Sequence, residues 1–318
     1  TQNKQPTATG FGQNEIFNGQ NRQGGAMITY SKTNPQTKKT TIKTDKKKKG
    51  SETTASKGEK PPITFDSIIF EVFNDKNELI RTIKQKAPKE NGVHRMYWYM
   101  NEKGKQRPSR RKPRENASEP GGVSVMPGNY KIKLHYGNET ATEKIAIAYD
   151  PRVEMPFEVL KNKYDLLKQL ENKMDVAAKA TQHLLASKEI LEDYQKRIKA
   201  QKKQKKYEDI LKSHTEIMKK IDGLLDDMFG KEDKRQGITA TEFPSTISYL
   251  YKARRYVSSL LQNPGQTEIN LVKNADEKVS AVIFKINEFY KTDWLNYKNS
   301  VENLKLSPFE EIKELEYK

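Results

Sequence analysis

The sequence of 318 residues contains no cysteine, which excludes disulfide bonds, zinc–thiolate sites and thiol-based catalysis. No apolar run approaches the roughly 20 residues that a helix needs to span a bilayer, so no transmembrane segment is predicted. Hydrophobic residues make up only 34% of the chain and charged residues 32%, which leaves enough apolar material for modest cores. The length favours two or three domains.

The sequence also lacks the motifs that indicate export or catalysis. It begins Thr1-Gln2-Asn3-Lys4, with neither a methionine nor a signal segment, so we expect a processed or excised part of a longer protein. There is no G-x-S-x-G motif and no P-loop, and the adjacent acids Asp226-Asp227 and Glu310-Glu311 point in different directions on a helix. No metal-binding spacing joins the four histidines, which are His94, His135, His183 and His214. These absences predict no catalytic, cofactor-binding or metal site and no cofactor.

The net charge of +17 is concentrated in three tracts. Residues 37–60 carry a net charge of +6, residues 101–115 carry +5 and residues 196–206 carry +7, so the rest of the chain is nearly neutral. Such tracts are usually solvated, but they can also contact an anionic surface. Lysine dominates two of the tracts and no aromatics interleave, which disfavours nucleic acid and leaves an anionic membrane surface as the alternative partner. The candidate contacts are Lys196, Arg197, Lys199, Lys202, Lys203, Lys205, Lys206, Arg107, Arg110 and Arg111.

A β-rich region is predicted around Pro127 and Gly128. These two residues indicate a turn, in which the proline fixes φ and the glycine supplies a positive φ. Apolar and lysine residues alternate strictly from Tyr130 onward, which is the period of a half-buried strand. Trp98 and Ile132 are expected in the core beside Tyr130. Similar strands are expected at residues 26–30, 67–73, 79–83, 93–100 and 143–149. Their spacing favours an immunoglobulin-like β-sandwich over residues 63–150.

The segment before this region is predicted to be a flexible linker, and the segment after it is predicted to be helical. Residues 37–62 are rich in lysine and threonine and predict a flexible basic linker. Asp150-Pro151-Arg152 is expected to act as a hinge and cap. Beyond it, apolar residues recur every three or four positions, which predicts an antiparallel bundle of about four helices over residues 151–318. The expected helices cover about 156–200, 205–229, 242–262 and 267–306, so the fold class is α+β and multidomain.

The exposed strand edges and long helical faces favour protein–protein binding. Trp294 and Tyr297 could form an interaction hot spot, although packing in the bundle core is the favoured interpretation for both. His214 is likewise expected in the bundle core rather than in a metal site.

Seven segments carry a family resemblance because of their order along the chain: Phe11-Gly12-Gln13-Asn14, Asn18-Gly19-Gln20-Asn21, Gly24–Tyr30, Leu79-Ile80-Arg81-Thr82, Val93–Trp98, Pro127-Gly128-Asn129-Tyr130 and Asp150-Pro151-Arg152. Together they resemble the C-terminal region of bacterial sortilin-like β-propeller proteins, with residues 1–36 as the segment that leaves the propeller. The β-rich part is also similar to the immunoglobulin-like domain of the flagellar hook-capping family. The resemblance covers residues 11–36 and 63–155, and the helical remainder matches only in pattern.

The resemblance implies an exported protein that is periplasmic, outer-membrane-associated or secreted, with a propeller preceding this region. It implies a non-catalytic region that supports the propeller and binds a protein partner. One alternative is an envelope-assembly component that contacts anionic lipid, polysaccharide or nucleic acid through the basic tracts. Another is an accessory region of a glycoside hydrolase, since such propellers often carry that label; none of the catalytic residues can be carried onto positions of this sequence.

Overall fold

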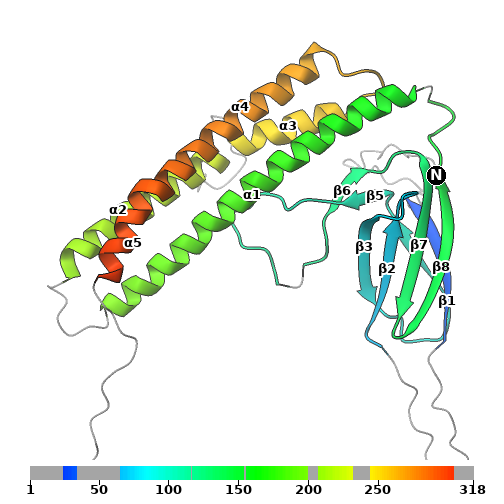
Figure 1. Cartoon of the computed structure of the whole chain (residues 1–318), viewed down its shortest axis with the longest axis horizontal. Helices are drawn as coiled ribbons and strands as arrows, with labels where there is room; N and C mark the ends of the chain where they lie inside the picture. The colour runs from blue at the N-terminus through cyan, green and yellow to red at the C-terminus, as the bar shows by residue number, and fades with distance from the viewer. Residues whose placement is uncertain are drawn as a thin grey trace, which may run out of the picture. The chain divides into compact units, whose positions relative to one another are not determined.

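The computed structural model describes residues 24–33, 65–115, 117–153, 155–199, 207–231 and 244–303. The chain divides into two compact units, which are drawn together in Figure 1. The β unit comprises Thr1–Lys103 and Ser124–Arg152, and the helical unit comprises Gly104–Val123 and Val153–Lys318. The chain is therefore a mixture of antiparallel sheets and helices, as the α+β class requires. The predicted linker 37–62 lies outside the described residues.

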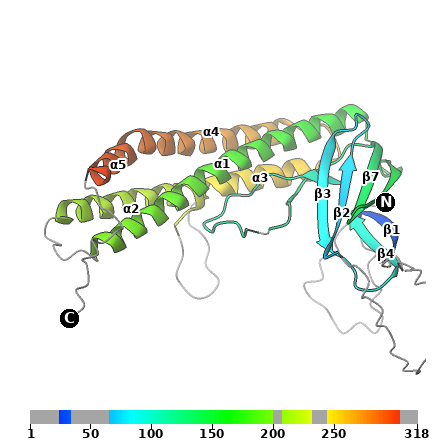
Figure 2. The same ribbon diagram turned by 60° about the horizontal axis from the view of Figure 1, so that its bottom comes forward.

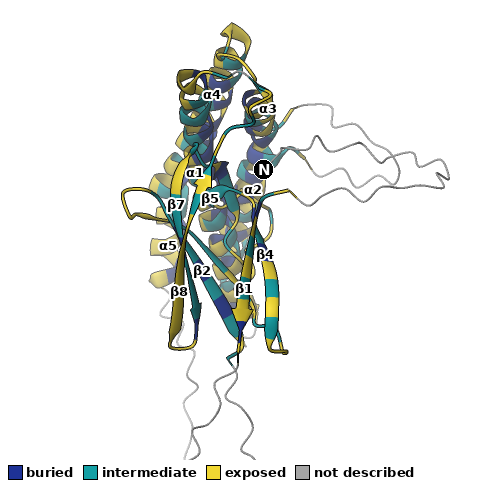
Figure 3. Ribbon diagram, turned by 90° about the vertical axis from the view of Figure 1, so that its right-hand side faces the viewer, coloured by how far each residue is buried: buried dark blue, intermediate teal, exposed yellow. Residues whose placement is uncertain are grey.

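The strands form three antiparallel sheets. They are β1 (Ala26–Lys32), β2 (Ser67–Phe73), β3 (Leu79–Lys86), β4 (Gly92–Trp98), β5 (Asn101–Lys103), β6 (Gly121–Ser124), β7 (Gly128–Tyr136) and β8 (Glu139–Ile147). The largest sheet has the order β3-β2-β7-β8, while β1 pairs with β4 and β5 pairs with β6. In β8 most residues are exposed, which Figure 3 shows in yellow.

One hydrophobic core joins the four-stranded sheet to the β1–β4 sheet. Ile68, Phe70 and Val72 alternate along β2 and are fully buried, because alternate residues of a strand point to one face. Trp98 enters from β4, is also fully buried, and its indole N–H donates to the carbonyl oxygen of Asn101 at 2.9 Å. Ile132 is buried in the same core. The predicted core positions at Trp98 and Ile132 are thereby confirmed.

The start of β7 differs from the prediction in one respect. Gly128 is the first residue of the strand, pairs with Ile147 and does not have a positive φ. The predicted positive φ is wrong because the residue already belongs to extended backbone. The left-handed conformation occurs instead at Gly137, with φ of 59°, in the two-residue turn between β7 and β8. Tyr130 is half-buried beside Trp98, and its hydroxyl donates to the carbonyl oxygen of Met126, next to Pro127, at 2.6 Å.

The helices of the helical unit follow the apolar periodicity of the sequence. They are α1 (Phe157–Lys199), α2 (Glu208–Phe229), α3 (Thr246–Ser259), α4 (Gln266–Phe289), the π-helical segment η2 (Tyr290–Trp294) and α5 (Leu295–Glu302). The first three lie close to their predicted ranges. The fourth predicted helix is divided by η2, but the backbone stays helical at Phe289 and Leu295 on either side, so α4, η2 and α5 form one continuous rod.

The helical segments pack as a bundle of three rods, each in contact with the other two, rather than as four antiparallel helices. Lys173 pairs with Asp276 and Ser187 contacts Tyr290, and both pairs are 103 residues apart, so α1 and α4 run parallel. The hydroxyl of Thr246 at the start of α3 donates to the carbonyl oxygen of Asp227 near the end of α2 at 2.9 Å. As Figures 1 and 2 show, α2 lies along the C-terminal half of α1 and α3 along its N-terminal half. The helices α2 and α3 therefore form one rod in two pieces.

The core of the helical unit is made by side chains from all three rods. Leu184 and Leu191 of α1, Ile221 of α2 and Leu250 of α3 are fully buried. His214 is buried as predicted, with its Nδ1 3.4 Å from the hydroxyl oxygen of Tyr297. Tyr297 is 5% exposed and so belongs to the core; the side chains packed against this core include Trp294.

Candidate functional site

The basic loop 104–123 belongs to the helical unit, although the sequence analysis placed it within the β-sandwich range 63–150. The amide of Gly104 donates to the carbonyl oxygen of Pro120 at 2.8 Å, which closes the loop at its base. A side chain at Gly104 would meet the backbone of Gly121 at 2.7 Å, so only glycine allows this close approach. Val123, at the end of the loop, is buried in the helical core.

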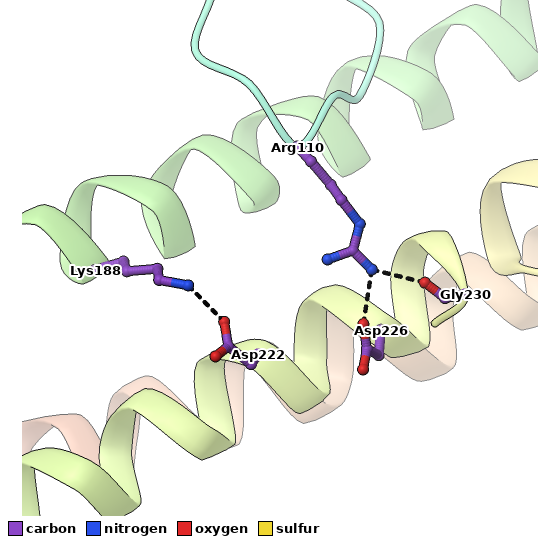
Figure 4. Close-up of polar contacts among 5 residues, drawn as sticks. All are labelled: Arg110, Lys188, Asp222, Asp226 and Gly230. Carbon is purple, nitrogen blue, oxygen red and sulfur yellow. Dashed lines mark hydrogen bonds and ion pairs between the residues drawn. The ribbon is translucent and has the colours of Figure 1, made fainter. Parts of the chain in front are cut away.

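Arg110 joins this loop to the end of α2, as Figure 4 shows. Its Nη2 donates to Oδ1 of Asp226 at 2.7 Å and to the carbonyl oxygen of Gly230 at 2.6 Å. Its guanidinium also lies 5.4 Å from the ring centre of Phe229. The last carbonyls of a helix have no partner within the helix and carry a partial negative charge, which a cation stabilises. Arg110 is therefore a side-chain cap supplied from a distant loop.

Two further contacts hold the loop against α1. The side-chain amide of Gln182 donates to Oε1 of Gln106 at 2.7 Å, and Lys112 forms an ion pair with Glu189. The loop therefore spans the seam between α1 and α2. Close by, Lys188 of α1 pairs with Asp222 of α2 at 2.7 Å, one turn before Asp226 (Figure 4).

These contacts divide the three arginines that the sequence nominated as anionic-surface contacts in this loop. Arg110 is partly buried and paired with Asp226, whereas Arg107 and Arg111 are exposed. Pro108 between them is buried. No local signal could have identified the role of Arg110, because Asp226 lies 116 residues away in sequence.

The second nominated cluster lies at the end of α1. Lys196, Arg197 and Lys199 occupy its last turn, where cations stabilise the helix dipole. The guanidinium of Arg197 lies 5.9 Å from the ring centre of Tyr194, and Lys196 is exposed. The other nominated residues of this cluster, Lys202, Lys203, Lys205 and Lys206, lie outside the described residues.

Asp150 and Arg152 form a local hydrogen-bonded cap, while the predicted hinge stays a prediction. Oδ1 of Asp150 accepts hydrogen bonds from the backbone amide and Nε of Arg152 at 3.0 and 2.9 Å. These bonds stabilise the carboxylate and lower the pKa of Asp150 to about 2. Pro151 lies between the two residues in a turn. The arrangement is exposed and caps the chain locally, with no feature of a catalytic acid.

A groove lies between α1 and α4 in the helical unit. Its volume is about 830 Å³ and its lining is mainly apolar. Val176 of α1 is 48% exposed, and Ile269 and Phe284 of α4 are 47% and 67% exposed. The ion pair between Lys173 and Asp276 joins the two helices along the same groove. Large apolar side chains left this exposed along one groove are typical of binding surfaces.

Neither a metal site nor a membrane-spanning helix is found in the described part of the chain. No group of three or more potential metal ligands comes together there. None of the helices described is long and apolar enough to cross a membrane. His135 lies 2.8 Å from Glu71 on the sheet, and His214 lies in the helical core.

A scan against protein-family models and searches of curated proteins and of solved structures find no match to this chain.

Proposed function

We propose that this chain is a non-catalytic interaction and scaffold region in which the groove between α1 and α4 binds an amphipathic helix of a partner protein. The observation that carries the proposal is the row of exposed apolar side chains at Val176, Ile269 and Phe284 along this groove. The family resemblance supports the same role, as part of an exported sortilin-like propeller protein in the periplasm, at the outer membrane or outside the cell. In that setting the β unit is an immunoglobulin-like sandwich that supports the propeller.

A helix is the occupant that the groove geometry favours. The α4 positions that line it extend from Ile269 to Asn287, a distance of roughly 27 Å at 1.5 Å per residue. Because α1 and α4 run parallel, a helix laid between them would contact both along its length and add a fourth rod to the bundle. The lining also includes the charged residues Lys173, Lys273 and Asp276, of which Lys173 and Asp276 form an ion pair between the two helices. The partner helix should therefore have an apolar stripe of about five turns flanked by charges of both signs.

The two alternatives derive less support from the described residues. Contact with an anionic partner through the basic loop would compete with the pairing of Arg110 with Asp226 and of Lys112 with Glu189. An accessory role in glycoside hydrolysis would depend on an active site in the upstream propeller. Neither alternative uses the groove.

The test is capture of a partner from the native cell envelope at high salt by the wild-type chain and by Phe284→Glu. The charged side chain should abolish capture of a stoichiometric partner, because it places an unpaired carboxylate in an apolar contact. Lys219→Glu, an exposed position on α2, is the matched control and should leave capture unchanged. A partner retained equally by both variants, or one whose bound segment is not helical, would refute the groove as the site.

A further inference from the structure

The four-stranded sheet has a second face whose composition the linear sequence does not show. Ile68, Phe70 and Val72 of β2 point into the core, so Ser67, Ile69, Glu71 and Phe73 point to the opposite face. The strand register then determines which residues of the other three strands share that outward face. They are Thr82, Lys84 and Lys86 of β3, Lys131, Lys133 and His135 of β7, and Thr140, Thr142 and Lys144 of β8.

The charge on this outward face is almost entirely of one sign. Its strand positions hold five lysines and one carboxylate, Glu71, which itself lies 2.8 Å from His135. The carboxylates Glu139 and Glu143 of β8 alternate to the other side, opposite Tyr136 and Ile132. The turn at one end of the sheet adds Asp75, Lys76 and Glu78, a net charge of only −1.

The lysines form a flat array rather than a line. Residues two apart on one strand are separated by roughly 6.7 Å, and β3 and β7 lie roughly 9.5 Å apart on either side of β2. Lys84, Lys86 and Lys144 are exposed, and Lys131 and Lys133 are partly exposed on the central strand β7. A linear polyanion would contact one row of such an array, whereas a planar anionic surface contacts all of it.

The side-chain types favour the planar surface. No arginine occupies an outward position for bidentate recognition of phosphate. The aromatic ring of Phe73 is only partly exposed and lies 4.9 Å below the ammonium group of Lys131, so it offers no open platform for stacking bases. Lysines act as point charges on flexible stems, which suits diffuse attraction to a charged layer.

We propose that the outward face of β3-β2-β7-β8 docks on an anionic lipid bilayer. The lysines provide the attraction, and the exposed threonines of β8 allow close approach to the headgroups. The inference is independent of the groove between α1 and α4, because the two surfaces belong to different units. It also does not use the three basic tracts.

The test is partitioning of the full chain onto vesicles of phosphatidylcholine with phosphatidylserine, with pure phosphatidylcholine vesicles as the neutral reference. Each lysine near an anionic surface should contribute roughly fivefold to the partition coefficient at low salt. The triple variant Lys84→Gln, Lys86→Gln and Lys144→Gln should therefore lower partitioning on the order of 100-fold. The matched control removes three exposed lysines of the helical unit, Lys212, Lys219 and Lys252, and should lower it less than about threefold.

A second readout locates the docking face itself. Because the chain has no cysteine, an environment-sensitive fluorophore can be attached at Thr142→Cys, on the outward face, or at Glu143→Cys, on the opposite face of the same strand. Anionic vesicles should shift the emission at position 142 but not at position 143. Equal shifts, equal losses in the two triple variants, or lysine-dependent binding to nucleic acid or heparin without binding to vesicles would each overturn the proposal. Far-UV circular dichroism checks that every variant keeps its strands.

Discussion

The two sides of α1 meet different surroundings. Toward α2, the loop 104–123 crosses the seam and contacts both helices through Gln106, Arg110 and Lys112. Toward α4, the helices leave a groove with exposed apolar side chains. Gln182, which the loop contacts, follows Lys173 of the groove by nine residues, so at about 100° per residue the two lie on opposite sides of α1.

The two sides of α1 differ in polarity and in what covers them. The seam between α1 and α2 is polar at its edge, with carboxylates at Glu189, Asp222 and Asp226, and the cations of the loop and of α1 satisfy them. The groove between α1 and α4 is mainly apolar, and the contacts of the loop described above lie at the seam instead. One side is covered by the chain itself, and we propose that a partner covers the other.

The largest expected difference is between truncating a side chain in the helical core and truncating one in the open groove. Leu184→Ala should lower the free energy of unfolding by about 2–5 kcal/mol, because Leu184 is fully buried and a cavity would remain. Phe284→Ala should cost less than about 1 kcal/mol, since the ring is 67% exposed. Urea unfolding followed by circular dichroism measures both. Equal losses would mean that the groove is part of the core.

The next largest loss of stability should come from removing the loop side chain that contacts the end of α2. Arg110→Ala should lower the free energy of unfolding by about 1–2 kcal/mol, because Asp226 and the carbonyl of Gly230 lose a charged donor at a partly exposed site. Arg111→Ala changes the neighbouring exposed arginine of the same loop and should have no measurable effect. If both arginines behave alike in thermal unfolding, the cap does not contribute.

His214, near the end of α2 that lies far from Arg110, should make the free energy of unfolding depend on pH. Burial, followed by the charge of Lys199, lowers the pKa of His214, while Glu192 opposes this change. The folded state therefore binds the proton less tightly than the unfolded state, so stability is full above the ordinary pKa near 6.5 and declines as the pH falls through it. His214→Gln should flatten the stability curve between about pH 7 and pH 5. An unchanged slope would show that other groups cause it.

The smallest effect is expected for the exposed ion pair of the loop. Lys112→Ala should change the free energy of unfolding by less than about 0.5 kcal/mol, because Lys112 and Glu189 are both about half exposed and solvent screens them. The loss should shrink further at high salt. A salt-insensitive loss as large as that of Arg110→Ala would show that the seam depends on the ion pairs as a group.

The sequence predicted the individual helices and strands better than it predicted which distant segments contact one another. The bounds of α1 follow from its long apolar period, and the buried face of β2 and the core position of Trp98 follow from alternation and size. The positive φ predicted at Gly128 is wrong because strand pairing begins at Gly128 itself, two residues before the predicted strand.

Contacts between distant segments could not be predicted. Arg110 contacts Asp226, and Ser187 contacts Tyr290, although each pair is more than 100 residues apart in sequence. Only the folded helical unit brings these residues together. The break between α2 and α3 conceals in the sequence that the two helices form one rod, so the four predicted helices pack as three rods. The basic outward face of the sheet is likewise invisible until the strand register places lysines of β3, β7 and β8 together.

The central claim is that the groove between α1 and α4 receives a partner helix, and photo-crosslinking tests it most directly. A photoreactive residue at position 284 should crosslink in the native envelope to one protein, through a peptide with an apolar stripe of helical period. The same residue at position 219, on exposed α2, should give no such product. Crosslinking to the same protein at both positions, or at neither, would contradict the account.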